Sequence, residues 1–169
     1  MAKRARAAAG IEVREAGAKG KGVFATRAFP AADVVMRFVA PLVSRRKLPD
    51  LTPWQREHLA EVDVGVWQVL PEPRCYLNHA CEPNAIQTPD RVYARREIQA
   101  GEEITLDYRL NAYDDGTVWR MTCECPAFAE PHDVFGDFFS LPPEKQRDYL
   151  PVAPPFIRAM YERRHPNPG

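Results

Sequence analysis

The stretch from Cys75 to Ala85 carries the side chains best suited to chemistry. It reads Cys-Tyr-Leu-Asn-His-Ala-Cys-Glu-Pro-Asn-Ala. A core strand would not tolerate two amides, an imidazole and a thiol unless each had a polar partner. The stretch is therefore either a binding site or a polar turn with one satisfied histidine. Its candidate side chains are those of Asn78, His79, Cys81 and Asn84.

The cysteines form a second candidate set. There are four of them, at positions 75, 81, 123 and 125. No secretion signal accompanies them, so metal binding or free thiols are better predictions than disulfides. The pair Cys123-x-Cys125 is more closely spaced than the two to four intervening residues that are usual at zinc sites.

Two further stretches flank the central one. Three glycines within residues 17–22 allow positive φ angles and close approach of the backbone to a ligand. The third glycine and the following helix of a dinucleotide fingerprint are missing, so a plain hairpin turn is the alternative. Residues 103–108 read as a strand that ends on Tyr108.

Composition restricts the class of protein. The 169 residues suffice for one domain with a real core, and 45% of them are hydrophobic. Apolar runs are too short to span a bilayer, and the balanced charge gives no general attraction to nucleic acid. The basic start, residues 1–10, lacks a signal-peptide core and is expected to be a flexible terminus. A transit peptide or an electrostatic arm is the alternative.

The elements that must position these groups are short. Seventeen prolines interrupt the chain too often for long helices. Thr52, Pro53 and Gln55 predict a capped helix that runs to about Glu61. Without β-α-β alternation, we expect a mainly β fold with a few helices. Strands are predicted at 11–14, 23–26, 34–40, 64–70, 91–98 and 103–108, and further helices after Ser140, with Pro142 in its first turn, and at 155–164.

Three stretches, in this order, resemble the SET-domain protein-lysine methyltransferases. They are Gly-Lys-Gly-Val-Phe-Ala at 20–25, Asn-His-Ala-Cys-Glu-Pro-Asn at 78–84 and Gly-Glu-Glu-Ile-Thr-Leu-Asp-Tyr at 101–108. Cys123-x-Cys125 follows where the family's post-SET segment begins. The resemblance implies a SET domain over 11–110, followed by a post-SET-like segment with C-terminal helices over 111–169.

The resemblance also implies a fold and a cofactor. Small twisted sheets would bring the Asn78–His79 and Tyr108 segments together in a knot-like arrangement, which is rare in proteins generally. S-adenosylmethionine would bind on one face, and the target lysine would enter by a narrow channel from the opposite face. The cofactor-binding residues implied are Gly20, Lys21, Gly22, Asn78, His79 and Tyr108.

Methyl transfer requires a lysine with a free lone pair, although an unperturbed lysine titrates near ~10.4. An apolar channel and the cationic sulfonium both lower that pKa, so no dedicated base is required. Tyr108 is the predicted catalytic residue, because its hydroxyl can orient the amine. Tyr76 and Tyr93 are candidates for channel walls or plain core. Leu106 stands where the family often has Phe or Tyr, which leaves room for added methyl groups.

The chain departs from the family at two places. The family often holds zinc with cysteines that correspond to Cys81, Cys123 and Cys125, but its fourth cysteine is replaced here by Glu130. The fourth ligand is therefore unknown: His132 or Cys75 could serve, or the thiols are buried without metal. Cys75 also stands where the family usually has an arginine, which puts a local salt bridge in doubt.

The predicted function is S-adenosylmethionine-dependent methylation of a lysine side chain in a protein substrate. One alternative is a non-catalytic SET-like module that binds a protein partner, and another is a small structural zinc protein. No membrane association is expected, and direct nucleic-acid binding is not implied. The abundance of Ala, Arg and Pro hints at a GC-rich genome, which favours a bacterial, cytoplasmic protein over a eukaryotic nuclear one.

Overall fold

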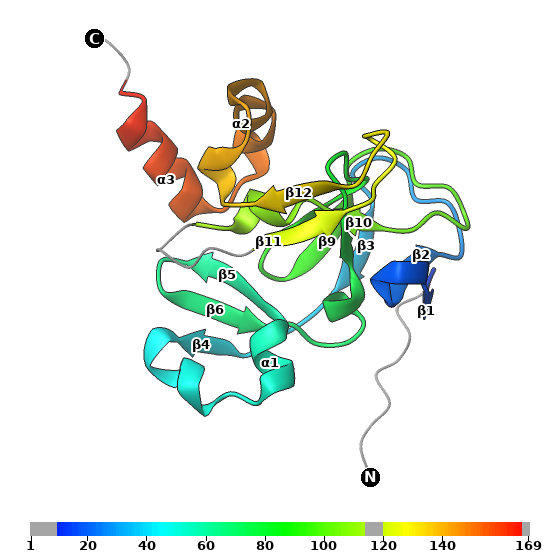
Figure 1. Ribbon diagram of the computed structural model, residues 1–169, viewed down its shortest axis with the longest axis horizontal. Helices are drawn as coiled ribbons and strands as arrows, with labels where there is room; N and C mark the ends of the chain where they lie inside the picture. The colour runs from blue at the N-terminus through cyan, green and yellow to red at the C-terminus, as the bar shows by residue number, and fades with distance from the viewer. Residues whose placement is uncertain (1–9, 114–119, 167–169) are drawn as a thin grey trace. The chain divides into compact units, whose positions relative to one another are not determined.

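The computed structural model describes residues 10–113 and 120–166. Residues 1–9 of the predicted basic terminus lie outside this range. Most elements are short strands, which confirms the prediction of a mainly β chain with a few helices. Figure 1 shows them in chain order. The strands are β1 (Ile11–Glu15), β2 (Lys21–Ala25), β3 (Val34–Arg37), β4 (Leu42–Ser44), β5 (Leu59–Asp63), β6 (Val66–Val69), β7 (Asn78–His79), β8 (Ala85–Gln87), β9 (Arg91–Ala94), β10 (Thr105–Leu106), β11 (Arg120–Cys123) and β12 (His132–Phe135).

The helices among the described residues are also short, with three to ten residues each. Three are α-helices: α1 (Pro53–Glu57), α2 (Pro143–Tyr149) and α3 (Pro155–Arg164). Among the described residues, no helix is both long and apolar enough to cross a lipid bilayer. Six 3₁₀ helices complete the set: η1 (Gly17–Lys19), η2 (Arg45–Asp50), η3 (Arg74–Tyr76), η4 (Tyr108–Asn111), η5 (Phe138–Ser140) and η6 (Leu150–Val152).

The chain forms two compact units, each built from two separate stretches. The first unit comprises residues 1–40 and 70–107, and the second comprises residues 41–69 and 108–169. The division predicted from the resemblance, 11–110 and 111–169, follows the order of the sequence and stays a prediction.

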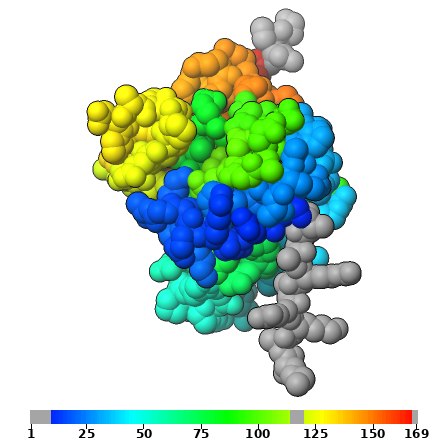
Figure 2. Space-filling model, turned by 90° about the vertical axis from the view of Figure 1, so that its right-hand side faces the viewer, coloured from blue at the N-terminus to red at the C-terminus, as the bar shows by residue number. Residues whose placement is uncertain are grey.

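Three small sheets make up the first unit. β1 and β2 form an antiparallel hairpin, which lies at the surface and is dark blue in Figure 2. β9 lies between β3 and β8 in an antiparallel sheet. Beneath them is one continuous cluster of buried apolar side chains, which includes the fully buried Val23, Phe29 and Ile98. Burial of such side chains is the main stabilising contribution to this unit.

The third sheet of this unit joins two of the motifs. β7 and β10 run parallel, with Asn78 opposite Thr105 and His79 opposite Leu106. The backbone N–H of Ala80 extends the pairing by donating to the Leu106 carbonyl, 2.9 Å away. Parallel strands need a long connection, and here it runs through β8 and β9. Motifs far apart in the sequence therefore lie side by side.

The second unit contains a three-stranded antiparallel sheet, a hairpin and the longer helices. β6 lies between β4 and β5, as Figure 1 shows, and β11 pairs with β12. The predicted helix 155–164 is confirmed as α3. The other predicted helix begins at Pro143, and Pro142 is its N-cap residue rather than part of its first turn. Buried aromatic side chains, including Phe138 and Tyr149, form the apolar interior on the helical side.

The predicted helix from Thr52 to about Glu61 is correct at its start and wrong at its end. Thr52 and Gln55 form both hydrogen bonds of the capping box. The helix ends at Glu57, because residues 59–63 pair with β6 as strand β5. Sheet pairing therefore prevails over local helix propensity here.

Four predicted strands are shorter than expected, and the one predicted at 64–70 spans only Val66–Val69. The 34–40 strand ends at Arg37, and the 91–98 strand ends at Ala94. Of residues 103–108, only Thr105 and Leu106 form a strand, while Glu103 makes an isolated bridge to Phe24. Isolated bridges of this kind join the small sheets without extending them.

Candidate active site

His79 has a ring enclosed within the first unit. Its side chain has no exposed surface, Nε2 lies 3.4 Å from Cys81 Sγ, and Nδ1 lies 3.8 Å from Asp107 Oδ1. A buried imidazole needs such polar neighbours. The protein itself therefore supplies the polar neighbours of the ring, and contact of the His79 backbone with a cofactor stays a prediction.

Asn78, beside it, has a half-buried side chain whose orientation is fixed by two partners. Its Nδ2 donates to the Lys21 carbonyl at 3.0 Å and to Glu103 Oε1 at 2.8 Å. Both partners can only accept hydrogen bonds, so the nitrogen must face them. The amide oxygen is thereby directed away from both, where it can accept a hydrogen bond from a ligand.

The glycine stretch forms the turn between β1 and β2, as the hairpin alternative predicted. Gly20 has a φ of 73°, which favours glycine, and its carbonyl accepts a hydrogen bond from Ala16 N at 2.6 Å. Gly22 has a different role, because a Cβ there would lie only 2.9 Å from Glu103 Oε1. Its lack of a side chain lets the Glu103 carboxylate approach the hairpin. Contact of Gly20, Lys21 and Gly22 with a cofactor stays a prediction.

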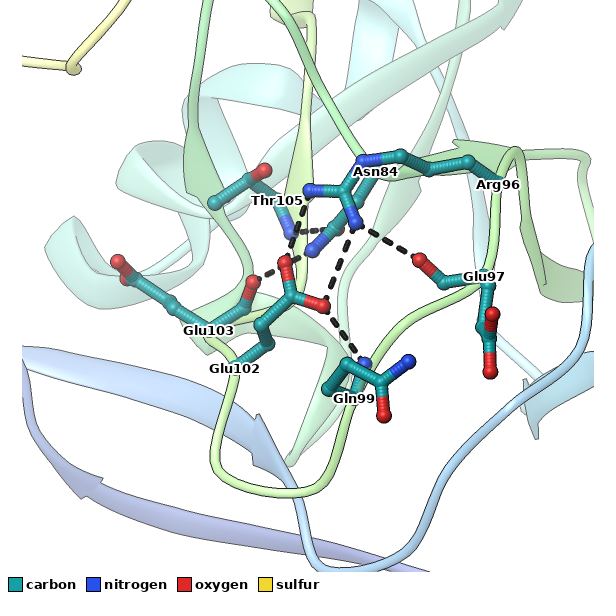
Figure 3. Close-up of polar contacts among 7 residues, drawn as sticks. All are labelled: Asn84, Arg96, Glu97, Gln99, Glu102, Glu103 and Thr105. Carbon is teal, nitrogen blue, oxygen red and sulfur yellow. Dashed lines mark hydrogen bonds and ion pairs between the residues drawn. The ribbon is translucent and has the colours of Figure 1, made fainter.

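Asn84 connects the central motif to the start of β10. Its Nδ2 donates to the Glu103 carbonyl at 2.8 Å, and its Oδ1 accepts from Thr105 N at 2.9 Å (Figure 3). The residue is buried, so the Thr105 amide would lose its partner without it. Asn84 was predicted only as a candidate polar side chain, the second amide of the motif, and its contacts with residues 103 and 105 had no signal in the sequence.

The turn before β10 is fixed by Glu102. Its carboxylate accepts from Arg96 Nη2 at 2.8 Å and from Gln99 N at 2.6 Å (Figure 3). The hydrogen bond from Arg96 is the main reason why the pKa of Glu102 lies below its ordinary value. This turn restrains the chain directly before the Glu103 and Thr105 contacts.

Tyr76 and Leu106, the predicted channel residues, both pack in the first unit. Tyr76 donates its hydroxyl to Glu72 Oε1 at 2.7 Å, which raises the pKa of Tyr76 to about 12. Lys21 Nζ lies 4.9 Å from the centre of its ring. The Lys21 ammonium group therefore makes a cation–π contact with one face of the Tyr76 ring. Leu106 is buried in the apolar cluster.

Tyr108, the predicted catalytic residue, begins η4 in the second unit. It follows Asp107 directly, at the end of the segment that carries β10. Tyr108 as a residue is 37% exposed, whereas Leu106, two residues earlier, is 4% exposed. Tyr108 is therefore partly accessible to solvent.

The second unit brings together three metal-type ligands. Cys123 and His132 are opposite each other in the β11–β12 hairpin, and Cys125 follows β11. Their ligand atoms lie within 4.8 Å of one another. Sulfur ligands on a tetrahedral zinc are separated by about 3.8 Å, given Zn–S bonds of about 2.3 Å. The set therefore fits zinc after a small adjustment.

His132, rather than Glu130, is the ligand-type side chain that joins this group. Its Nδ1 lies 3.4 Å from the Glu130 carbonyl, and the tautomer that donates from Nδ1 to this carbonyl leaves a lone pair on Nε2 for a metal. Cys75 is a poorer candidate, because it is not among the ligand-type side chains that lie close together. Burial raises the pKa of its thiol to about 11. Cys81 lies in the first unit, and its role as a zinc ligand stays a prediction.

Comparisons with known proteins agree with the motifs. Residues 20–109 match the SET domain family. The chain is 30% identical over 134 residues to "Histone-lysine N-methyltransferase ATX2" of Arabidopsis thaliana, which covers 66% of this chain and 12% of that protein. It is 26% identical over 170 residues to "Histone-lysine N-methyltransferase, H3 lysine-36 specific" of Eremothecium gossypii, which covers 86% of this chain and 24% of that protein.

A solved structure shares the fold. KRYPTONITE, crystallised in complex with mCHG DNA and SAH, has a TM-score of 0.54 at 22% identity, over 70% of this chain and 27% of that one. This likeness concerns the fold, and the chain spans a small part of the relatives that it matches. Since the family match covers more than half of the residues and contains both the glycine and the Asn-His motifs, the chain belongs to the SET-domain family.

Proposed function

We propose that this chain is an S-adenosylmethionine-dependent protein-lysine methyltransferase. The observation that carries the proposal is the parallel pairing of β7 with β10, which aligns Asn78–His79 with the segment that leads into Tyr108. The named relatives are histone-lysine methyltransferases, which supports lysine as the acceptor. S-adenosylmethionine, when bound, supplies an electrophilic methyl group on a sulfonium.

Each predicted cofactor-binding residue has a proposed contact with S-adenosylmethionine. The Asn78 amide oxygen would accept from the cofactor's ammonium group, since its nitrogen is already held by Lys21 and Glu103. The His79 backbone would hold the adenine end. The backbone of the glycine turn, Gly20 to Gly22, would approach the cofactor as the resemblance implies, and Tyr108 would close the site at the reacting end.

Tyr108 would orient the incoming amine through its hydroxyl. A lysine must be neutral to react, and an apolar surrounding lowers its pKa towards that state. Correct orientation of two reactants can contribute about 7–11 kcal/mol. Leu106 would supply apolar surface near the acceptor, and the face of Tyr76 would favour a cation during entry.

We also propose that zinc organises the post-SET-like segment. Cys123, Cys125 and His132 would be three ligands, and Cys81 the fourth by family resemblance. Zinc would hold the β11–β12 hairpin in place and would take no part in methyl transfer. Metal analysis of purified protein tests this directly, and protein that retains no zinc after preparation without chelators would contradict it.

The substrate is proposed to be a lysine-bearing protein in a bacterial cytoplasm. Composition supports this location, and cell fractionation with an antibody against the chain would test it. The number of methyl groups transferred follows from mass spectrometry of the product.

The decisive experiment is incubation of the pure protein with methyl-labelled S-adenosylmethionine and a panel of lysine-bearing proteins, including the protein itself. We expect label on lysine in at least one target. Tyr108→Phe keeps the ring and should lower the rate by about 100-fold or more, in the range for loss of one preorganised transition-state contact.

Tyr113→Phe is the matched control, because Tyr113 lies near the same 3₁₀ helix and its backbone, not its hydroxyl, contacts Glu61. Its rate should stay near that of the wild type. If calorimetry shows that the wild-type protein binds no S-adenosylmethionine, the alternative of a non-catalytic module prevails. An unchanged rate in Tyr108→Phe removes Tyr108 from the chemistry.

A further inference from the structure

Glu103 links three parts of the first unit through one carboxylate. Its Oε1 accepts from Asn78 Nδ2 at 2.8 Å, and its Oε2 lies 2.7 Å from Lys19 Nζ. Lys19 closes the turn between β1 and β2, and Asn78 starts β7. Segments that are 84 and 25 residues away in the sequence therefore meet at the same side chain.

The hairpin is shaped to admit this carboxylate. A Cβ on Gly22 would come within 2.9 Å of Glu103 Oε1 and within 2.9 Å of the Ala16 Cβ. The Lys21 carbonyl, next to Gly22, accepts the second N–H of Asn78 at 3.0 Å. Only a residue without a side chain at position 22 lets the carboxylate and the amide meet the hairpin together.

This ion pair differs from others in the same unit. The Lys19 and Glu103 side chains are 34% and 19% exposed, whereas those of Arg27 and Asp33 are 51% and 43% exposed and lie 3.5 Å apart. Reduced contact with water strengthens a charge-assisted hydrogen bond. Lys19 also neutralises the carboxylate that orients the Asn78 amide.

We propose that Lys19 and Glu103 are positioning residues for cofactor binding. Glu103 holds the Asn78 amide with its oxygen towards the cofactor site, and Lys19 holds Glu103 and the glycine turn in register. This inference rests on the proposed function, because the ligand in question is S-adenosylmethionine. Neither side chain is required to touch that ligand.

The test is calorimetric titration of S-adenosylmethionine into the full chain and its variants. Lys19→Met should raise Kd about fivefold, as expected for loss of one partly exposed charge-assisted contact. Lys19→Arg keeps the charge and should stay within about twofold of the wild type. Glu103→Ala should raise Kd by about tenfold or more, because Asn78 loses one of its two acceptors and Lys19 loses its carboxylate partner.

Arg27→Met is the matched control, since it removes an exposed cation from the same unit without touching Asn78. Its Kd should equal that of the wild type. A positioning role also predicts that the Kd of the wild type rises more steeply with salt than that of Lys19→Met. Thermal midpoints of Lys19→Met and the wild type should differ by no more than about 2 °C.

The outcomes separate the two proposals. If the wild type binds S-adenosylmethionine and Lys19→Met has the same Kd and salt dependence, the positioning role is overturned and the proposed function stands. If the wild type binds none, both proposals fall. A Lys19→Met variant that binds weakly only because its thermal midpoint has collapsed, with no rescue by arginine, also overturns the positioning role.

Discussion

The interior of each of the two compact units is stabilised by a different kind of interaction. The first unit has one continuous apolar cluster, with side-chain amides and carboxylates at its margin. The second unit combines a small sheet, buried aromatic side chains and a hairpin that carries two thiols and an imidazole. The motif-bearing unit should therefore fold without metal, whereas part of the second unit should depend on it.

The largest effect is expected from truncation of the first unit's core. Phe29 is fully buried, so Phe29→Ala should lower the free energy of unfolding by about 3–5 kcal/mol. The matched variant is Phe138→Ala, which truncates an equally buried ring in the second unit. Among the described residues, Trp54 and Trp67 belong to the second unit, so their fluorescence in urea reports on that unit.

Hydrogen exchange of β2 and β9 amides reports on the first unit. If the fluorescence and exchange transitions coincide for both variants, the two units unfold together. The chain would then have a single free energy of unfolding, and the two units could not be assigned separate stabilities.

The next largest effect should come from the proposed zinc ligands. His132→Ala should abolish stoichiometric zinc and destabilise the second unit by about 3 kcal/mol, the linkage expected for a ligand present at a few hundred times its Kd. The ring centre of Phe128 lies 4.2 Å from that of His132, so Phe128 should become more exposed in this variant. Zinc content by atomic spectrometry and tryptophan fluorescence provide the measurements.

His165→Ala is the control for this experiment, because His165 stacks on Tyr161 in α3 and belongs to the same unit. It should retain zinc and stability. Equal loss of protection in β2 and β11 on chelation would show that the first unit also depends on metal.

A smaller effect is expected at the margin of the first unit. Asn84→Ala removes the partners of Thr105 N and of the Glu103 carbonyl, and should cost about 2 kcal/mol of unfolding free energy. Urea denaturation measures the loss. Asn84→Asp keeps the acceptor for Thr105 N and should be less destabilising than alanine at neutral pH. A greater loss with aspartate would show that the Glu103 carbonyl contact dominates.

The smallest effect concerns acid stability. The pKa of Glu102 is lowered in the folded state, so its contribution is present above its ordinary pKa and is lost as pH falls through the lowered value. The group is partly exposed, and the contribution should not exceed about 0.5 kcal/mol. Glu102→Gln should therefore flatten the fall of stability below about pH 4.5. If the free energy of unfolding has the same pH dependence in Glu102→Gln as in the wild type, other carboxylates cause the loss of stability in acid.

Local signals in the sequence predicted local structure well. Thr52 and Gln55 identified the start of α1, and the helix predicted at 155–164 matches α3. The end of α1 was mispredicted, because pairing of β5 with β6 is a tertiary effect that no local pattern encodes.

The sequence predicted which types of residue form the candidate site, but it did not predict the hydrogen bonds and ion pairs between them. The Asn-His motif identified Asn78, yet nothing near it in the sequence indicated that Lys19 and Glu103 control its orientation. Similarly, Gly22 was read as making room for a ligand, whereas its Cβ direction is filled by a carboxylate of the protein itself. Such contacts join segments that are far apart in the sequence, and no local sequence pattern encodes them.

The brevity of the β7–β10 pairing has a consequence for the order of folding. Two residues on each strand provide little enthalpy to compensate for closing the chain between them. The β1–β2 hairpin needs only a local turn, so it can form first. The β7–β10 pairing should then be among the last features to form in folding and the first to be lost in unfolding. A ligand that contacts both strands would therefore slow unfolding more than it speeds folding.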